Sequence, residues 1–174
     1  MFKTILVATD GSESSGRAVE TASELAGMSE ARLVVLHVLY PSLPKELLHM
    51  AEVEHLVEPE NPAPSVLLGG PVATTTVGAR PLVEASEVSR AIAEIGQRIV
   101  AEAELTAKQA GVKDVRTRVE DGDAATRIME TAKEEGADLI VLGRRGLGLL
   151  QGLLMGSVSS KVTHLADCAC LTVK

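Results

Sequence analysis

The chain has 174 residues and a formal net charge of −7 at pH 7, with 24 acidic against 17 basic side chains. Its length fits one domain, and its hydrophobic fraction of 45% supplies a core and excludes wholesale disorder. The acidic balance argues against a general nucleic-acid surface, and one Phe, one Tyr and no Trp leave almost no rings for stacking bases.

The sequence shows no segment for membrane insertion or export. It contains no run of 18 apolar residues, and its first residues lack the charged region, apolar stretch and cleavage site of a secretory signal. Cys168 and Cys170 are too close together for a normal structural disulfide and too few for a zinc site. We therefore expect a protein of the reducing cytoplasm, without membrane or nucleic-acid partners.

Five short segments predict strands. Residues 4–8, 33–38 and 139–142 are almost continuously apolar, which is typical of parallel strands that are covered on both faces. Between residues 115 and 119, Val and Thr alternate with Arg, which favours an edge strand with one wetter face. Residues 168–173 form the fifth candidate.

Apolar residues at helical spacing lie between these strands. The clearest stripe runs through residues 88–103, and shorter ones cover residues 18–26, 128–132 and 158–165. Glycines 27, 111 and 136 follow three of the stripes, where we expect left-handed helix caps. Strands that alternate with helices predict an α/β fold, with a parallel sheet and helices on both faces.

One segment, at about residues 41–87, departs from this alternation. Residues 45–58 have a partly aligned apolar stripe that could form a helix, whereas residues 59–81 contain five prolines and no periodicity. We interpret the second part as an extended surface loop. The sequence thus predicts a single domain over residues 1–174 that a Pro-rich, variable insert interrupts.

The sheet predicts where a ligand would bind. In open parallel sheets, ligands bind at the carboxyl ends of the strands, where the direction of winding reverses. If the fourth strand lies beside the first, the polar turns at residues 9–12 and 143–146 meet at this point. A continuation rich in glycine leads through Gly156 to Ser157, and we expect Ser157 to cap a helix.

Such a segment suits a phosphate, because glycines let backbone N–H groups converge and a helix N-terminus favours an anion. The hydroxyls of Ser157 and Ser159 would add donors. A plainer interpretation is also open, in which the glycines form turns and Ser157 only caps its helix. The chain has no P-loop, and its glycines do not form a dinucleotide fingerprint after the first strand.

Several motifs together resemble the nucleotide-binding members of the universal stress protein family. Those members carry the pattern G-x2-G-x9-G-[ST], which this chain matches without a gap as Gly143-x2-Gly146-x9-Gly156-Ser157. Asp10-Gly11-Ser12, Leu36-His37-Val38 and residues 136–143 extend the match. The chain departs from the family where Ala124 follows Gly122-Asp123 and where Ala169 follows Cys168, since Pro is common at both places.

The resemblance implies a five-stranded sheet in the order 3-2-1-4-5, as in adenine nucleotide α-hydrolase-like folds. It also implies a bound ATP, or AMP or ADP, accompanied by Mg²⁺. Adenine and ribose would contact Thr9, Asp10 and the backbone of Val38, and the ribose would border Gly143 and Arg144. The phosphates would lie against Gly146, Gly156, Ser157, Val158 and Ser159, with Arg145 as a weaker candidate.

The resemblance further implies a homodimer that pairs through the last strand, with Leu171 and Val173 in the contact, and a role in stress response or signalling. No residue stands out as a base that activates water, and no metal-ligand motif occurs, so we expect little or no hydrolysis. Two alternatives remain at this point: a slow ATP-hydrolysing enzyme of the same fold, and an interaction protein that binds no nucleotide.

Overall fold

The structure is a computed structural model that describes residues 1–39, 81–147 and 155–174, with side chains from residue 89 onward in the second range. The possible helix at 45–58 and the Pro-rich stretch up to residue 80 lie outside the described residues, as do Gly148 and Gly152. The elements in chain order are β1 (Thr4–Ala8), α1 (Glu13–Ser29), β2 (Arg32–Leu39), α3 (Pro81–Gln109), β3 (Val115–Asp121), α4 (Ala124–Glu135), β4 (Leu139–Gly143), α5 (Ser157–Leu165) and β5 (Ala169–Val173).

The five strands form one parallel sheet in the order β3-β2-β1-β4-β5. Ile5 of the central strand β1 is in register with Leu33 of β2 and with Leu139 of β4. This arrangement confirms the predicted fold class and strand order, including the placement of β3 at an edge. The reversal of winding therefore lies between β1 and β4, where the sequence predicts the ligand.

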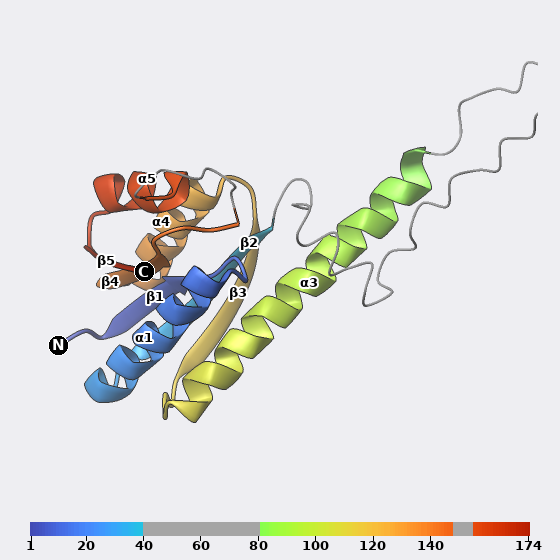
Figure 1. Cartoon of the computed structure of the whole chain (residues 1–174). Helices are drawn as coiled ribbons and strands as arrows, with labels where there is room; N and C mark the ends of the chain where they lie inside the picture. The colour runs from blue at the N-terminus through green and yellow to red at the C-terminus, as the bar shows by residue number, and fades with distance from the viewer. Residues whose placement is uncertain (40–80, 148–154) are drawn as a thin grey trace, which may run out of the picture.

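Helices cover both faces of the sheet (Figure 1). On one face α1 and α3 pack side by side over a core that includes Ile5, Val35 and Val141. On the other face α4 and α5 pack together over Leu6, Leu36 and Ile140. Because the central strands are buried on both faces, almost every position along them is apolar, which explains their continuous hydrophobic pattern.

Two helix boundaries differ from the expectation. Helix α3 begins at Pro81, so the last residues of the expected insert are helical, and proline is well tolerated in a first turn. Helix α1 continues through Gly27 to Ser29, and its cap is Glu30, which takes the left-handed conformation (φ 51°). Gly27 instead permits close packing, since a Cβ there would lie 3.1 Å from the Ala110 carbonyl oxygen.

The remaining expected caps are confirmed, because Gly111 (φ 87°) follows α3 and Gly136 (φ 63°) ends α4. Helix α3, with 29 residues, is long enough to cross a bilayer, but neither it nor any other described helix has a sufficiently apolar stretch to do so.

Candidate functional site

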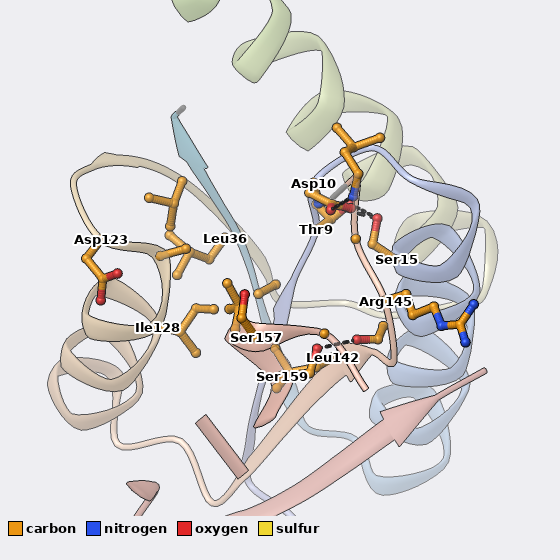
Figure 2. A pocket seen from close by; sticks show the side chains of 18 of the residues that line it. Thr9, Asp10, Ser15, Leu36, Asp123, Ile128, Leu142, Arg145, Ser157 and Ser159 are labelled. Carbon is orange, nitrogen blue, oxygen red and sulfur yellow. Dashed lines mark hydrogen bonds between the residues drawn. The ribbon is translucent and has the colours of Figure 1, made fainter. Parts of the chain in front are cut away.

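A cavity of about 420 Å³ opens at the carboxyl ends of the strands, over the point where the winding reverses (Figure 2). The ends of β1, β2 and β4 form its floor, and the first residues of α4 and α5 form its sides. A cavity is therefore present where the sequence predicts the site, and the volume of this cavity falls in the range of small-molecule sites.

One part of the cavity is apolar. Leu36 and Val38 come from β2, Leu142 from β4 and Ile128 from α4. These side chains also belong to, or pack against, the core between the sheet and α4 and α5, so neighbouring packing holds them in place. Such a surface can bind the faces of a flat, weakly polar group such as a nucleobase.

The loop after β1 supplies a polar side. Thr9 is buried, and its hydroxyl lies 3.1 Å from the hydroxyl of Ser15. Asp10 joins this loop to the glycine-rich segment: its Oδ1 accepts from the backbone N–H of Ser12 (3.0 Å) and its Oδ2 from that of Leu147 (2.9 Å). The Asp10 carboxylate therefore fixes the spacing between two loops that are far apart in the sequence.

His37, on β2, makes a hydrogen bond to the same loop. It is 2% exposed, and its Nδ1–H donates to the Thr9 carbonyl oxygen (2.8 Å). Burial lowers the pKa of His37, while the Thr9 hydrogen bond and the negative charge of Asp10 oppose this shift. His37 is thus a satisfied core histidine that positions Thr9 and does not itself line the cavity.

Gly143 and Gly146 allow close approaches around the site. A Cβ on Gly143 would lie 2.8 Å from the backbone of Ser14 and Ser15, at the start of α1. A Cβ on Gly146 would overlap the Asp10 carboxylate. The first two glycines of the motif are therefore needed for packing, in addition to any contact with a ligand.

The start of α5 corrects one expectation. The helix cap is Gly156 and not Ser157, and no side chain caps this end. Gly156 takes an extended conformation and donates its N–H to the Arg144 carbonyl oxygen (2.8 Å), which aligns the chain so that Ser157 is already helical.

The expectation that the Ser159 hydroxyl binds a phosphate is also corrected. This hydroxyl is buried and donates to the Gly143 carbonyl oxygen (2.7 Å). It holds α5 against β4 and is not available as a phosphate donor. Within the described part of the chain, the backbone N–H groups of Ser157, Val158 and Ser159 contact no acceptor, as is normal in a first helical turn. These three amides are the donors that the site offers to an anion.

Earlier amides of the motif are engaged by protein groups. Arg144 donates its N–H to the Val173 carbonyl oxygen (2.6 Å) and Arg145 to the Ser14 hydroxyl (3.4 Å). The anion donors thus come from the start of α5 more than from the described glycine-rich turn.

Nine of the ten predicted site residues line the cavity, and Arg144 is the exception. The N–H of Arg144 continues the hydrogen-bond ladder between β4 and β5, whereas Arg145, the next residue, lines the cavity. The weaker of the two arginine candidates is therefore the better placed.

The turn between β3 and α4 is part of the site, although none of its residues is among the predicted site residues. Gly122, Asp123 and Ala124 all line the cavity. The predicted parallel sheet already indicated this turn, because the carboxyl end of a parallel β3 must lie at the same edge of the sheet as those of its neighbours. Asp123 caps α4 through a hydrogen bond from the Thr126 backbone N–H, a role that a Gly-Asp turn before a helix suggests.

The cysteines lie away from this site. Cys168 and Cys170 are free thiols that pack on the same side of the sheet, and burial raises the pKa of each. Within the described ranges, no group of three or more His, Cys, Asp or Glu side chains is arranged to hold a metal ion.

Comparisons with known proteins identify the family of the chain. A family model described as "Universal stress protein family" matches residues 1–174. Universal stress protein YxiE of Bacillus subtilis is 30% identical over 177 residues, which span the whole of both chains. Universal stress protein Rv1636 of Mycobacterium tuberculosis is 30% identical over 172 residues, which cover 99% of this chain and 96% of its own.

Solved structures show the same fold. The crystal structure of a universal stress protein in complex with cAMP is similar with a TM-score of 0.60 and 26% identity, over 99% of this chain and 97% of that one. The structure of MJ0577 is similar with a TM-score of 0.69 and 21% identity, over 100% of this chain and 96% of that one, and shows the shared fold.

Proposed function

Because the chain belongs to the universal stress protein family, we propose that it is an adenine-nucleotide-binding protein of the cytoplasmic stress response. In this proposal a homodimer binds ATP, or AMP or ADP, in the cavity at the carboxyl edge of the sheet, with little or no hydrolysis.

The observation that carries the proposal is the division of the cavity into two chemically different parts. Leu36, Ile128 and Leu142 offer an apolar surface that suits a base, and the free N–H groups of Ser157–Ser159 offer donors that suit a phosphate. The positive end of the α5 dipole lies behind these donors. A nucleotide contains both a base and phosphates, so a single bound nucleotide would use both parts of the cavity. The relative solved with cAMP supports this assignment.

Charge near the phosphates would come from Arg145, which lines the cavity and is exposed. Mg²⁺ would be held by the phosphates and water, because the described residues contain no cluster of three potential metal ligands. In that arrangement the ion reduces the negative charge of the bound triphosphate.

The polar groups around the cavity favour binding over hydrolysis. A base that activates water must be within hydrogen-bond reach of the attacking water and able to take its proton. Asp10 contacts the described start of the glycine-rich segment, and both of its oxygens already accept backbone N–H groups. These contacts give Asp10 a structural role in holding two loops together, and a nucleotide-free interaction protein would leave the α5 amides without an anion.

The proposal is tested by the nucleotide that wild-type protein carries and by its affinity for ATP. Denaturing freshly purified protein should release an adenine nucleotide, and calorimetry on the emptied protein should show ATP binding. A Gly156→Val variant should bind at least tenfold more weakly, because its side chain occupies the cavity beside the donors. The fold should tolerate it, since a Cβ at residue 156 meets protein atoms at 3.5 Å or more.

The matched control is Gly16→Val, because Gly16 is an exposed α1 residue whose Cβ would meet nothing within 4 Å. It should bind ATP as the wild type does. Protein that carries no nucleotide and binds no added ATP would refute the proposal, as would full affinity in a folded Gly156→Val variant. Steady phosphate release that saturates with ATP would establish the slow enzyme instead.

A further inference from the structure

Two thiols lie close together at the start of β5. Cys168 directly precedes this strand and Cys170 is its second residue. Because the strands are parallel, their amino ends share one edge of the sheet, and the cavity opens at the other edge. Both cysteines are free and partly exposed, and neither lines the cavity. They form a pair of sulfur ligands that an ion can reach from solvent.

The two side chains lie on the same face of the sheet. Both pack against the core between the sheet and the helices α4 and α5. The thiol of Cys170 donates to the Cys168 carbonyl oxygen, with Sγ 3.8 Å from that oxygen. The sulfur of Cys170 therefore leans back along the chain, toward the preceding cysteine.

The spacing of the pair suits a metal ion better than a disulfide. Side chains two positions apart on one face of an extended chain are about 6.6 Å apart. A disulfide needs Cβ atoms about 3.5–4.5 Å apart, so it would require the backbone to move. A metal ion bound by two thiolates adds two bonds of about 2.3 Å each and bridges sulfur atoms about 4.6 Å apart. Side chains that lean toward each other along a strand reach this separation.

The number of ligands selects the kind of ion. Among the residues that the structure describes, no third His, Cys, Asp or Glu side chain joins the pair in a metal-binding group. Zinc and iron–sulfur clusters also bind thiolates, but they require four protein ligands or nearly so. Cu(I) is a soft ion with a filled d shell, and two thiolates in a line satisfy it.

The electrostatics of the pair keep it reduced and close. Burial raises the pKa of both thiols, and the negative charges of Asp138 and Asp167 raise the pKa of Cys168 further. A charge on Cys168 also raises the pKa of Cys170, so the two sulfur atoms are near enough to interact. Protonated thiols react slowly with oxidants. The pair therefore remains a dithiol until an ion with high affinity for sulfur displaces the protons.

We propose that Cys168 and Cys170 form a two-coordinate binding site for Cu(I). On binding, each thiol loses its proton to solvent and each sulfur forms one bond to the ion, and no electron is transferred. This site lies at the opposite edge of the sheet from the cavity, and it does not depend on the proposed nucleotide function.

The test measures the affinity of the reduced, full-length protein for Cu(I), under argon, by competition with the coloured chelator bicinchoninate. The wild type should bind one Cu(I) per chain. Cys168→Ser and Cys170→Ser should each bind about a hundredfold to ten-thousandfold more weakly, the range by which a second linked ligand raises affinity. X-ray absorption of the wild-type complex should show two sulfur neighbours around the copper.

Two controls keep the test specific. Met28 is 77% exposed and is another soft sulfur ligand, so Met28→Leu should keep the wild-type affinity for Cu(I). Zn(II), in place of Cu(I), should bind the wild type no more tightly than it binds Cys170→Ser, because two thiolates leave the zinc ion without its other two ligands. Urea unfolding of the serine variants should show that each remains folded.

Several results would overturn the inference. Two Cu(I) per chain would show that the thiols act separately, and one Cu(I) per two chains would place the site between subunits. Wild-type affinity in either folded serine variant, or no Cu(I) binding by the wild type, would also refute it. Calorimetry with ATP distinguishes this failure from that of the proposed function, since the nucleotide binds at the other edge of the sheet.

Discussion

At the scale of single residues, His37 shows how a buried titratable group supports the site. Its Nδ1–H supplies the hydrogen bond that the Thr9 carbonyl needs once β1 has ended at Ala8. The ring is enclosed by the core, and Gly96 of α3 lets the helix approach it, since a Cβ there would lie 3.0 Å from the His37 ring. The neutral imidazole is therefore part of the packing, and a charged one would lack solvation.

This burial predicts a pH dependence of stability. The pKa of His37 is lowered in the folded state, so below about pH 6.5 the unfolded chain binds a proton that the folded protein does not. The contribution is complete above that pH and is lost as the pH falls toward the lowered pKa. The free energy of unfolding, from urea titrations at pH 7.5 and 5.5, should decrease by up to about 1.4 kcal/mol per pH unit from this group.

A His37→Asn variant should weaken this dependence, because an amide can still donate to Thr9 but does not titrate. His164 is exposed, so His164→Asn should keep the wild-type slope. An unchanged slope in folded His37→Asn would show that another group causes the loss of stability.

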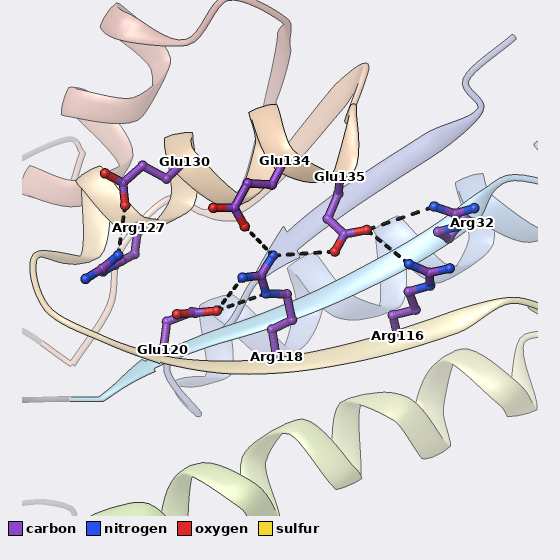
Figure 3. Close-up of polar contacts among 8 residues, drawn as sticks. All are labelled: Arg32, Arg116, Arg118, Glu120, Arg127, Glu130, Glu134 and Glu135. Atoms are coloured by element: carbon purple, nitrogen blue, oxygen red, sulfur yellow. Dashed lines mark hydrogen bonds and ion pairs between the residues drawn. The ribbon is translucent and has the colours of Figure 1, made fainter.

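At the scale of elements, ion pairs join β2 and β3 to α4 (Figure 3). Glu135, whose side chain is 15% exposed, lies within 3.9 Å of Arg32, 3.5 Å of Arg116 and 3.4 Å of Arg118. Arg118 also pairs with Glu120 on its own strand. The wetter face of β3, which the alternation of Arg with Val and Thr predicts, is thus neutralised by the C-terminal end of α4.

Glu135→Gln should destabilise the protein by about 1–3 kcal/mol, because it removes the shared anion from three guanidinium groups in a partly enclosed place. Urea unfolding measures the effect. The control is Glu130→Gln on the same helix, whose one exposed pair with Arg127 should contribute less than about 0.5 kcal/mol. Equal effects from the two variants would contradict the assignment of Glu135 as the central anion.

At the scale of the whole molecule, β5 forms an edge of the described sheet. In the described sheet β5 pairs with β4 on one side, and the Val173 carbonyl accepts from Arg144, so the Val173 backbone faces β4. Because successive residues of a parallel strand turn their backbone groups to opposite sides, Thr172 faces outward. The side chains of Leu171 and Val173 pack against the core under α1, so the proposed dimer would pair mainly through backbone groups.

A Thr172→Pro substitution should separate the proposed dimer while leaving each subunit folded. Proline is tolerated in an edge strand where its missing N–H would face away from the sheet, but it removes a donor from an intersubunit ladder. Analytical ultracentrifugation should give twice the chain mass for the wild type and for Thr172→Val, and the chain mass for Thr172→Pro. A monomeric wild type would refute the dimer.

The sequence by itself determined the strands, most of the helices and the place of the cavity. These follow from local patterns: strands buried on both faces are continuously apolar, and polar, glycine-rich turns after β1 and β4 must meet once the sheet is parallel. The shared motifs added the strand order, which composition and periodicity leave open.

Only the tertiary structure decided which groups within the site are available. Asp10 accepts from Leu147 across 137 positions of sequence, and the Ser159 hydroxyl donates to Gly143 rather than to a ligand. Likewise Arg145, and not Arg144, lines the cavity, and Asp123 joins it from the far strand. The physical reason is that neighbours in space decide which groups face the cavity and which donors are already engaged, and sequence spacing does not specify those neighbours.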